Sequence, residues 1–132
     1  MNKKDIDHLV KAAIAASRKA YAPYSKFHVG AALQTVEGDM FTGCNVENAS
    51  YGLTICAERN ALFAAVAAGR KKFKAIAIVA CGKAKPFPCG ACRQVLAEFC
   101  GPDFPVIIAS ANNPAAYEIV SLGDLLPNTF KF

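Results

Sequence analysis

The sequence lacks any apolar run approaching the roughly 18 residues that a membrane-spanning helix requires, so we expect no membrane partner. It also lacks an apolar signal region, because Met1–Asp5 leads into a mixed, charged helical pattern. We therefore expect a cytoplasmic protein whose thiols are kept reduced.

An electrostatic footprint for nucleic acid is missing as well. The net charge is only +5, and the one local basic cluster consists of Arg70-Lys71-Lys72 and Lys74. No aromatic residues are interleaved with these cations to form a stacking platform for bases. A cluster of this kind is typical of a solvated helix end, so we expect no nucleic-acid partner.

The chain shows no internal repeats and no linker-like segments. Its 132 residues fit one domain, residues 1–132, which is long enough to bury a sizeable core. The hydrophobic content of 54% and the mean hydropathy of +0.25 are high for a chain of this size. We expect the apolar surplus to face other subunits.

The spacing of apolar residues predicts an α/β fold. In chain order we expect a helix at 5–20 capped by Asp5, strands at 27–33 and 40–46, a polar loop at 45–53, a helix at 56–68, a strand at 73–80, a loop at 81–88, a helix at 89–100, strands at 106–110 and 117–122, and a closing segment at 123–132. This order predicts a three-layer α/β sandwich, in which helices cover a mixed central sheet.

Six cysteines do not indicate a disulfide framework here, because the chain lacks a signal region and is large enough for a core of its own. Half of them are expected to be small, buried apolar residues: Cys44, Cys81 and Cys100. The other half are candidate metal ligands: Cys56, Cys89 and Cys92.

The candidate ligands occur in two short motifs, Cys56-Ala57-Glu58 and Pro88-Cys89-Gly90-Ala91-Cys92. Three thiolates with a carboxylate that need not be a ligand predict a zinc site with one open position, which is typical of catalytic rather than structural zinc. The pair Cys89 and Cys92 alone would equally suit a thioredoxin-like redox motif. A redox pair does not require a third cysteine beside a glutamate, so we expect one Zn²⁺ per chain.

Both motifs are placed where a loop becomes a helix, and the N-terminal end of a helix favours thiolate over thiol. Three thiolates on one Zn²⁺ leave a formal charge of −1, which opposes activation of water. We expect Arg59 to offset this charge, Arg93 to be a weaker candidate for the same role, and Gln94 to donate a hydrogen bond near the ligands. Glu58, two residues after a ligand, is the expected proton shuttle.

These motifs closely resemble those of the small cytidine deaminases. The resemblance extends to Asn45-Val46-Glu47-Asn48-Ala49-Ser50, to Ala22-Pro23-Tyr24-Ser25-Lys26-Phe27 and to Leu125-Leu126-Pro127, so it covers nearly the whole chain. It implies a homotetramer that hydrolyses the C4 amino group of cytidine and deoxycytidine in pyrimidine salvage. It further implies Cys56, Cys89 and Cys92 as zinc ligands and Glu58 as the residue that carries protons to N3 and to the leaving amine.

The same resemblance implies how the nucleoside is held. Asn45 and Glu47 would bind the ribose, the backbone of Ala57 would touch the pyrimidine, and Phe27 would border the base. An amide and a carboxylate in a polar loop are chemically suited to sugar hydroxyls. Tyr51 and Phe130 are candidates for reaching the site of a neighbouring subunit.

Two alternatives remain open at this point. A blasticidin S deaminase-like enzyme shares the length, the three-cysteine site and the Cys-Ala-Glu motif, although Glu47-Asn48-Ala49 is the nucleoside-type loop. A non-catalytic zinc-binding module would leave Glu58 without a role. Deaminases that edit nucleic acid are disfavoured by the missing basic footprint.

Overall fold

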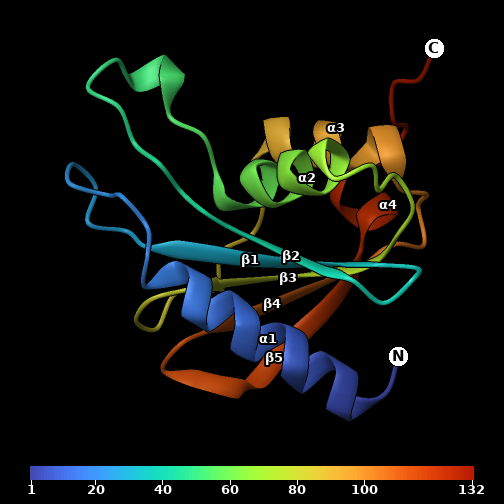
Figure 1. Ribbon diagram of the computed structural model, residues 1–132, viewed down its shortest axis with the longest axis horizontal. Helices are drawn as coiled ribbons and strands as arrows, with labels where there is room; N and C mark the ends of the chain where they lie inside the picture. The colour runs from blue at the N-terminus through green and yellow to red at the C-terminus, as the bar shows by residue number, and fades with distance from the viewer.

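A computed structural model describes all 132 residues, Met1–Phe132. Its centre is a five-stranded sheet in the order β2-β1-β3-β4-β5 (Figure 1). The strands are β1 (Val29–Thr35), β2 (Met40–Cys44), β3 (Phe73–Ala80), β4 (Pro105–Ser110) and β5 (Asn113–Ser121). Only β3 and β4 are parallel, and every other neighbouring pair is antiparallel. The predicted mixed sheet is thus confirmed.

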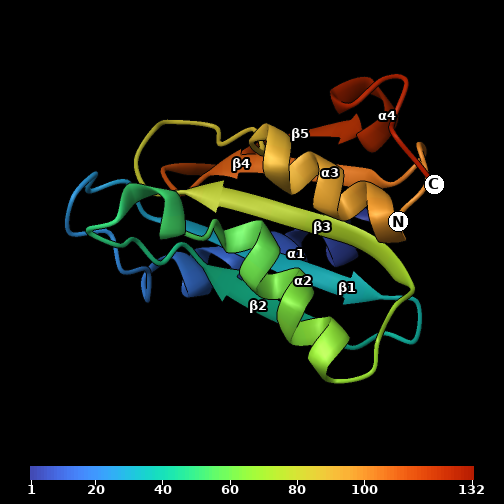
Figure 2. The same cartoon turned by 90° about the horizontal axis from the view of Figure 1, so that it is seen from above.

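Helices cover both faces of this sheet. The helix α1 (Lys3–Ser17) packs on one face, and α2 (Ala57–Ala67), α3 (Gly90–Phe99) and the short α4 (Leu122–Leu125) lie on the other (Figure 1). Seen from above, α2 and α3 lie side by side over the sheet (Figure 2). The predicted three-layer α/β sandwich is therefore correct. No helix combines the length and the apolarity needed to cross a membrane.

The central strand β3 shows why the layers form. Ile76 and Ile78 belong to the core beneath α2 and α3, whereas Ala77 and Val79 belong to the core beneath α1. A strand buried on both faces has no polar alternation, which explains its nearly continuous apolar sequence. Each fully buried Ile or Leu stabilises such a core by about 1.5–3 kcal/mol.

Several predicted boundaries were wrong. The cap of α1 is Asn2, whose side chain accepts from the Asp5 N–H at 2.9 Å, so Asp5 lies inside the helix. The last strand begins at Asn113 rather than at residue 117, because an exposed edge strand has no buried face to impose an apolar alternation. Tyr51–Leu53 forms a 3₁₀ helix (η1) within the expected loop.

Two glycines allow a helix to approach the sheet closely. A Cβ at Gly30 in β1 would lie 2.0 Å from the Ala13 carbonyl oxygen of α1. A Cβ at Gly43 in β2 would lie 2.4 Å from the Ala61 nitrogen and 2.6 Å from the Ala57 oxygen, both in α2. Gly43 thereby fixes the height above the sheet of the helix that follows Cys56.

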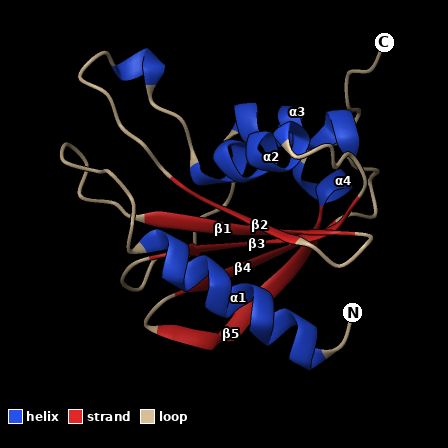
Figure 3. Ribbon diagram, in the orientation of Figure 1, coloured by secondary structure: helices blue, strands red, loops and turns tan.

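The loops that matter for function gather at one end of the sheet. The segments before β1, between β2 and α2, and after β3 all extend beyond the same sheet end (Figure 3). The apolar layers therefore leave a shared rim there, where residues from distant parts of the chain meet.

Candidate active site

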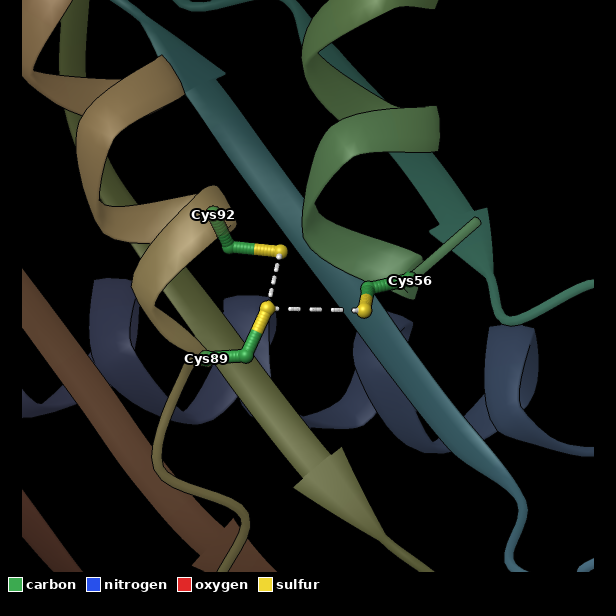
Figure 4. Close-up of side chains that lie close together, drawn as sticks. All are labelled: Cys56, Cys89 and Cys92. Atoms are coloured by element: carbon green, nitrogen blue, oxygen red, sulfur yellow. Dashed lines mark hydrogen bonds between the residues drawn. The ribbon is translucent and has the colours of Figure 1, made fainter. Parts of the chain in front are cut away.

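The three candidate ligands converge from two helix starts. Cys56 is the N-cap of α2 and Cys89 the N-cap of α3, with Cys92 one turn further on (Figure 4). The Cys89 sulfur lies 3.8 Å from that of Cys56 and 3.6 Å from that of Cys92, and all three sulfurs are within 4.8 Å of one another. A tetrahedral centre with Zn–S bonds of about 2.3 Å requires sulfurs about 3.8 Å apart. The cluster therefore fits Zn²⁺.

The ionisation of the three cysteines also favours a bound cation. The Cys92 thiol and then Arg59, whose Nη2 donates to the Cys56 sulfur at 3.5 Å, lower the pKa of Cys56 to about 5. The hydrogen bond between the Cys92 and Cys56 thiols, together with burial, raises the pKa of Cys92. By themselves, neighbouring thiols resist a second ionisation, because two thiolates would repel each other. A divalent cation removes this conflict and allows all the thiols to ionise.

Glu58 is buried beside the cluster, with only 5% of its surface exposed, in the first turn of α2. Burial raises the pKa of its carboxyl group to about 7, and the charge of Cys56 acts in the same direction. A carboxyl group whose pKa lies near neutral pH can both accept and return a proton. Its position outside the sulfur cluster leaves it available for that exchange.

A cavity of about 650 Å³ opens onto this site. Its walls include Cys56, Cys89 and Glu58 and five residues predicted to bind substrate: Phe27, Asn45, Glu47, Tyr51 and Ala57. Residues not given an individual role from the sequence also line it: Tyr24, Ser25, Val29, Asn48, Ala49, Thr54, Pro86 and Phe87. Tyr24 and Ser25 lie within the quoted Ala22–Phe27 motif, whereas Pro86 and Phe87 lie in the loop expected at residues 81–88, which carries no comparable signal.

Asn45 and Glu47 hold the cavity walls together through their side chains. Asn45 Oδ1 accepts from the Val29 N–H at 2.9 Å, and its Nδ2 donates to the Phe27 carbonyl at 2.8 Å. Glu47 Oε1 accepts from the Tyr24 and Ser25 N–H groups at 3.0 and 3.1 Å, and Oε2 accepts from the Ser25 hydroxyl. This hydroxyl is the main cause of the lowered pKa of Glu47.

The structure places other predicted residues outside the cavity. Phe130 is 71% exposed and does not line it, and Gln94 Nε2 donates to the Phe130 carbonyl at 3.4 Å. The Arg93 guanidinium donates to the carbonyls of Pro88 and Leu125, both at 2.7 Å, so it ties the loop before Cys89 to α4. That role was missed, because Leu125 is distant in sequence.

The remaining cysteines only partly match expectation. Cys100 is buried, which raises the pKa of its thiol to about 12, and Cys44 is half-buried. Cys81 is exposed, so the prediction that it is a buried apolar residue was wrong. It follows the last residue of β3, where the chain leaves the sheet for the loop.

An α/β sandwich that places three thiols and a buried carboxyl group beside a cavity defines a zinc-dependent hydrolase. The family described as the cytidine and deoxycytidylate deaminase zinc-binding region matches residues 3–108. The chain belongs to this family, and its cofactor is zinc.

Similar proteins agree with this assignment. A cytidine deaminase of Halalkalibacterium halodurans is 49% identical over 126 residues, which cover 96% of this chain and 94% of the relative. The crystal structure of a cytidine deaminase from Burkholderia pseudomallei is 51% identical with a TM-score of 0.88, and the match covers 98% of this chain and 100% of that one. A blasticidin-S deaminase of Bacillus cereus is 33% identical, but over only 64% of this chain and 65% of its own length.

Proposed function

We propose that this protein hydrolyses cytidine and deoxycytidine to uridine and deoxyuridine with release of ammonia. The observation that carries this proposal is the cluster of three sulfurs with a buried carboxyl group at the wall of a nucleoside-sized cavity. A structural zinc module requires neither the cavity nor Glu58. The close similarity to cytidine deaminases over nearly the whole chain supports the nucleoside as substrate.

Cys56, Cys89 and Cys92 would hold the zinc, which supplies Lewis acidity for the activation of water. Glu58 accepts a proton from the attacking water and returns it to N3, so that the oxygen adds to C4. Glu58 then takes the remaining proton of the added water from the hydroxyl group at C4 and transfers it to the amino group. The C4–N bond breaks, ammonia leaves, and a C4 carbonyl remains.

The cavity walls would position the nucleoside for this reaction. The backbone of Ala57 contacts the pyrimidine next to Glu58, and Phe27 borders the base. Asn45 and Glu47 bind the ribose hydroxyls with the hydrogen-bonding capacity left after their internal contacts, since each carboxylate or amide oxygen can accept more than one bond. Rigid placement of such groups is what converts binding into a productive orientation.

Assembly into a homotetramer is part of this proposal. Tyr51 is 90% exposed and Phe130 71% exposed, and both are large side chains that a neighbouring subunit would cover. Phe130, which lies outside the cavity of its own chain, would complete a neighbour's site, whereas Tyr51 lines the cavity of its own chain. We further propose one domain spanning residues 1–132, a cytoplasmic location and a place in pyrimidine salvage.

The variant Glu58→Gln tests the proposal, because it preserves size and removes proton exchange. We expect it to retain one zinc per chain and to lose about 10²–10⁴-fold or more in cytidine turnover, followed as the loss of cytidine absorbance. Free cytosine, adenosine, a cytidine nucleotide and blasticidin S serve as comparison substrates. Zinc without turnover of any cytosine compound by the wild type would instead support a non-catalytic module.

A further inference from the structure

Phe87 is a cavity residue that the mechanism above does not use. It lies in the segment between β3 and α3, two residues before the ligand Cys89. The residue is 49% exposed, and it lines the cavity together with Pro86 and Cys89. An aromatic side chain at the wall of a substrate cavity, two residues before a zinc ligand, is placed to touch a molecule that binds there.

The wall that carries Phe87 is held on several sides. Pro86 and Pro88 flank it and fix the backbone φ on both sides, and Pro88 is fully buried. The Pro88 carbonyl accepts from Arg93 Nε at 2.7 Å, and Lys85 Nζ donates to Glu118 in β5 at 3.2 Å. These contacts restrain the backbone that carries the Phe87 side chain at the cavity wall.

The chemistry of the pyrimidine indicates which part of the substrate meets this wall. The reacting C4 has two ring neighbours, N3 and C5. In the proposed function N3 faces Glu58, which belongs to α2 together with Cys56. The C5 edge then faces away from α2, toward the side of Cys89. Pro86 and Phe87 line the cavity and come three and two residues before Cys89 in the chain.

We propose that Phe87 determines which substituents the enzyme tolerates at C5 of the cytosine ring. Its side chain limits the space beside C5, so hydrogen is accepted and larger groups are penalised according to their size. This inference rests on the proposed function, since it takes C4 as the reacting atom and Glu58 as the group at N3.

Substrates with different C5 substituents test the proposal. The quantity to measure is kcat/KM for 5-fluoro-, 5-methyl- and 5-bromocytidine, each divided by that for cytidine. In the wild type we expect this ratio to fall with substituent size. In Phe87→Ala we expect the 5-methyl ratio to rise about 10-fold or more, since a single methyl group in a tight pocket is worth about 10–200-fold. Phe87→Leu should lie between the two.

A matched control is Phe63→Ala. Phe63 is 48% exposed, nearly the same as Phe87, but it lies on α2 and does not line the cavity. Its removal should leave the C5 ratios unchanged, whatever it does to the overall rate. A second readout is independent of turnover: in a Glu58→Gln background, titration calorimetry should show that Phe87→Ala strengthens 5-methylcytidine binding relative to cytidine.

The outcomes separate this inference from the proposed function. If the wild type deaminates cytidine but the C5 ratios and the relative binding are unchanged in Phe87→Ala and Phe87→Leu, the role of Phe87 is refuted while the function stands. If zinc-loaded wild type turns over no cytosine nucleoside, the proposed function fails and this inference fails with it.

Discussion

The close contact between β2 and α2 at Gly43 makes a strong prediction about the zinc site. In Gly43→Ala, the new Cβ would lie 2.4 Å from the Ala61 nitrogen and 2.6 Å from the Ala57 oxygen. Both are backbone atoms of α2, so the clash cannot be relieved by a rotamer change. The helix must move away from the sheet, and Cys56 and Glu58 at its start must move with it.

The size of the effect follows from the cost of overpacking, which is about 1–3 kcal/mol in a well-packed protein. For a domain of this size that corresponds to a fall in Tm of about 3–15 °C. A displacement of α2 also pulls the Cys56 sulfur away from the Cys89 sulfur, which is now 3.8 Å away. We therefore expect weaker zinc binding, measured by competition with a chromophoric chelator, together with reduced turnover.

Two other glycines supply the controls. Gly30→Ala creates a similar clash with α1, on the opposite face of the sheet, so it should lower Tm without a selective loss of zinc affinity. A Cβ at Gly101 would meet nothing within 4 Å, so Gly101→Ala should be close to neutral in both measurements. If Gly43→Ala keeps full zinc affinity, or loses no more than Gly30→Ala, the link between this contact and the ligand geometry is refuted.

Three further predictions concern the site and the thiols. Ser25→Ala removes the main cause of the lowered pKa of Glu47, so this pKa should rise in a carboxyl NMR titration and KM for cytidine should increase. Because the pKa of Glu47 is lowered in the folded state, its ionised carboxylate stabilises the fold above the ordinary carboxyl pKa. This stabilisation is lost as the pH falls through the folded-state pKa. The difference in the free energy of unfolding between the wild type and Ser25→Ala should therefore narrow in acid. Arg59→Gln leaves the negative charge of Cys56 less compensated, so the acidic limb of the pH–rate profile should move to higher pH while zinc is retained; an unmoved limb would contradict this role. At pH 8 iodoacetamide should modify exposed Cys81 well before buried Cys100, whose pKa is raised to about 12, and equal labelling by mass spectrometry would contradict the assigned burial.

Much of the fold could be predicted because local pattern and burial agree. The strand β3 was predicted with its observed bounds, since a run buried on both faces carries a strong apolar signal. The helices after Cys56 and Cys89 were placed to within a residue at their starts. The start of β5 was predicted too late in the chain, because its first residues are exposed and follow no apolar period. The cap of α1 was misassigned because Asn2 and Asp5 are both good capping residues.

The chemistry of the metal ligands could be predicted without the fold. Cys56, Glu58, Cys89 and Cys92 form short motifs whose members are a turn or less apart, so their spacing alone indicated a metal site with a carboxyl group beside it. Zinc and the family could be expected from the same residues.

The shape of the substrate cavity depends on contacts between residues that are distant in sequence. The contacts of Glu47 with Tyr24 and Ser25 span 23 and 22 positions, and that of Arg93 with Leu125 spans 32. These partners meet because the sheet order β2-β1-β3-β4-β5 brings the loops before β1, after β2 and after β3 to one rim. The spacing of residues along the chain does not predict such long-range contacts. The place of Phe87 in the cavity wall therefore follows only from the three-dimensional structure.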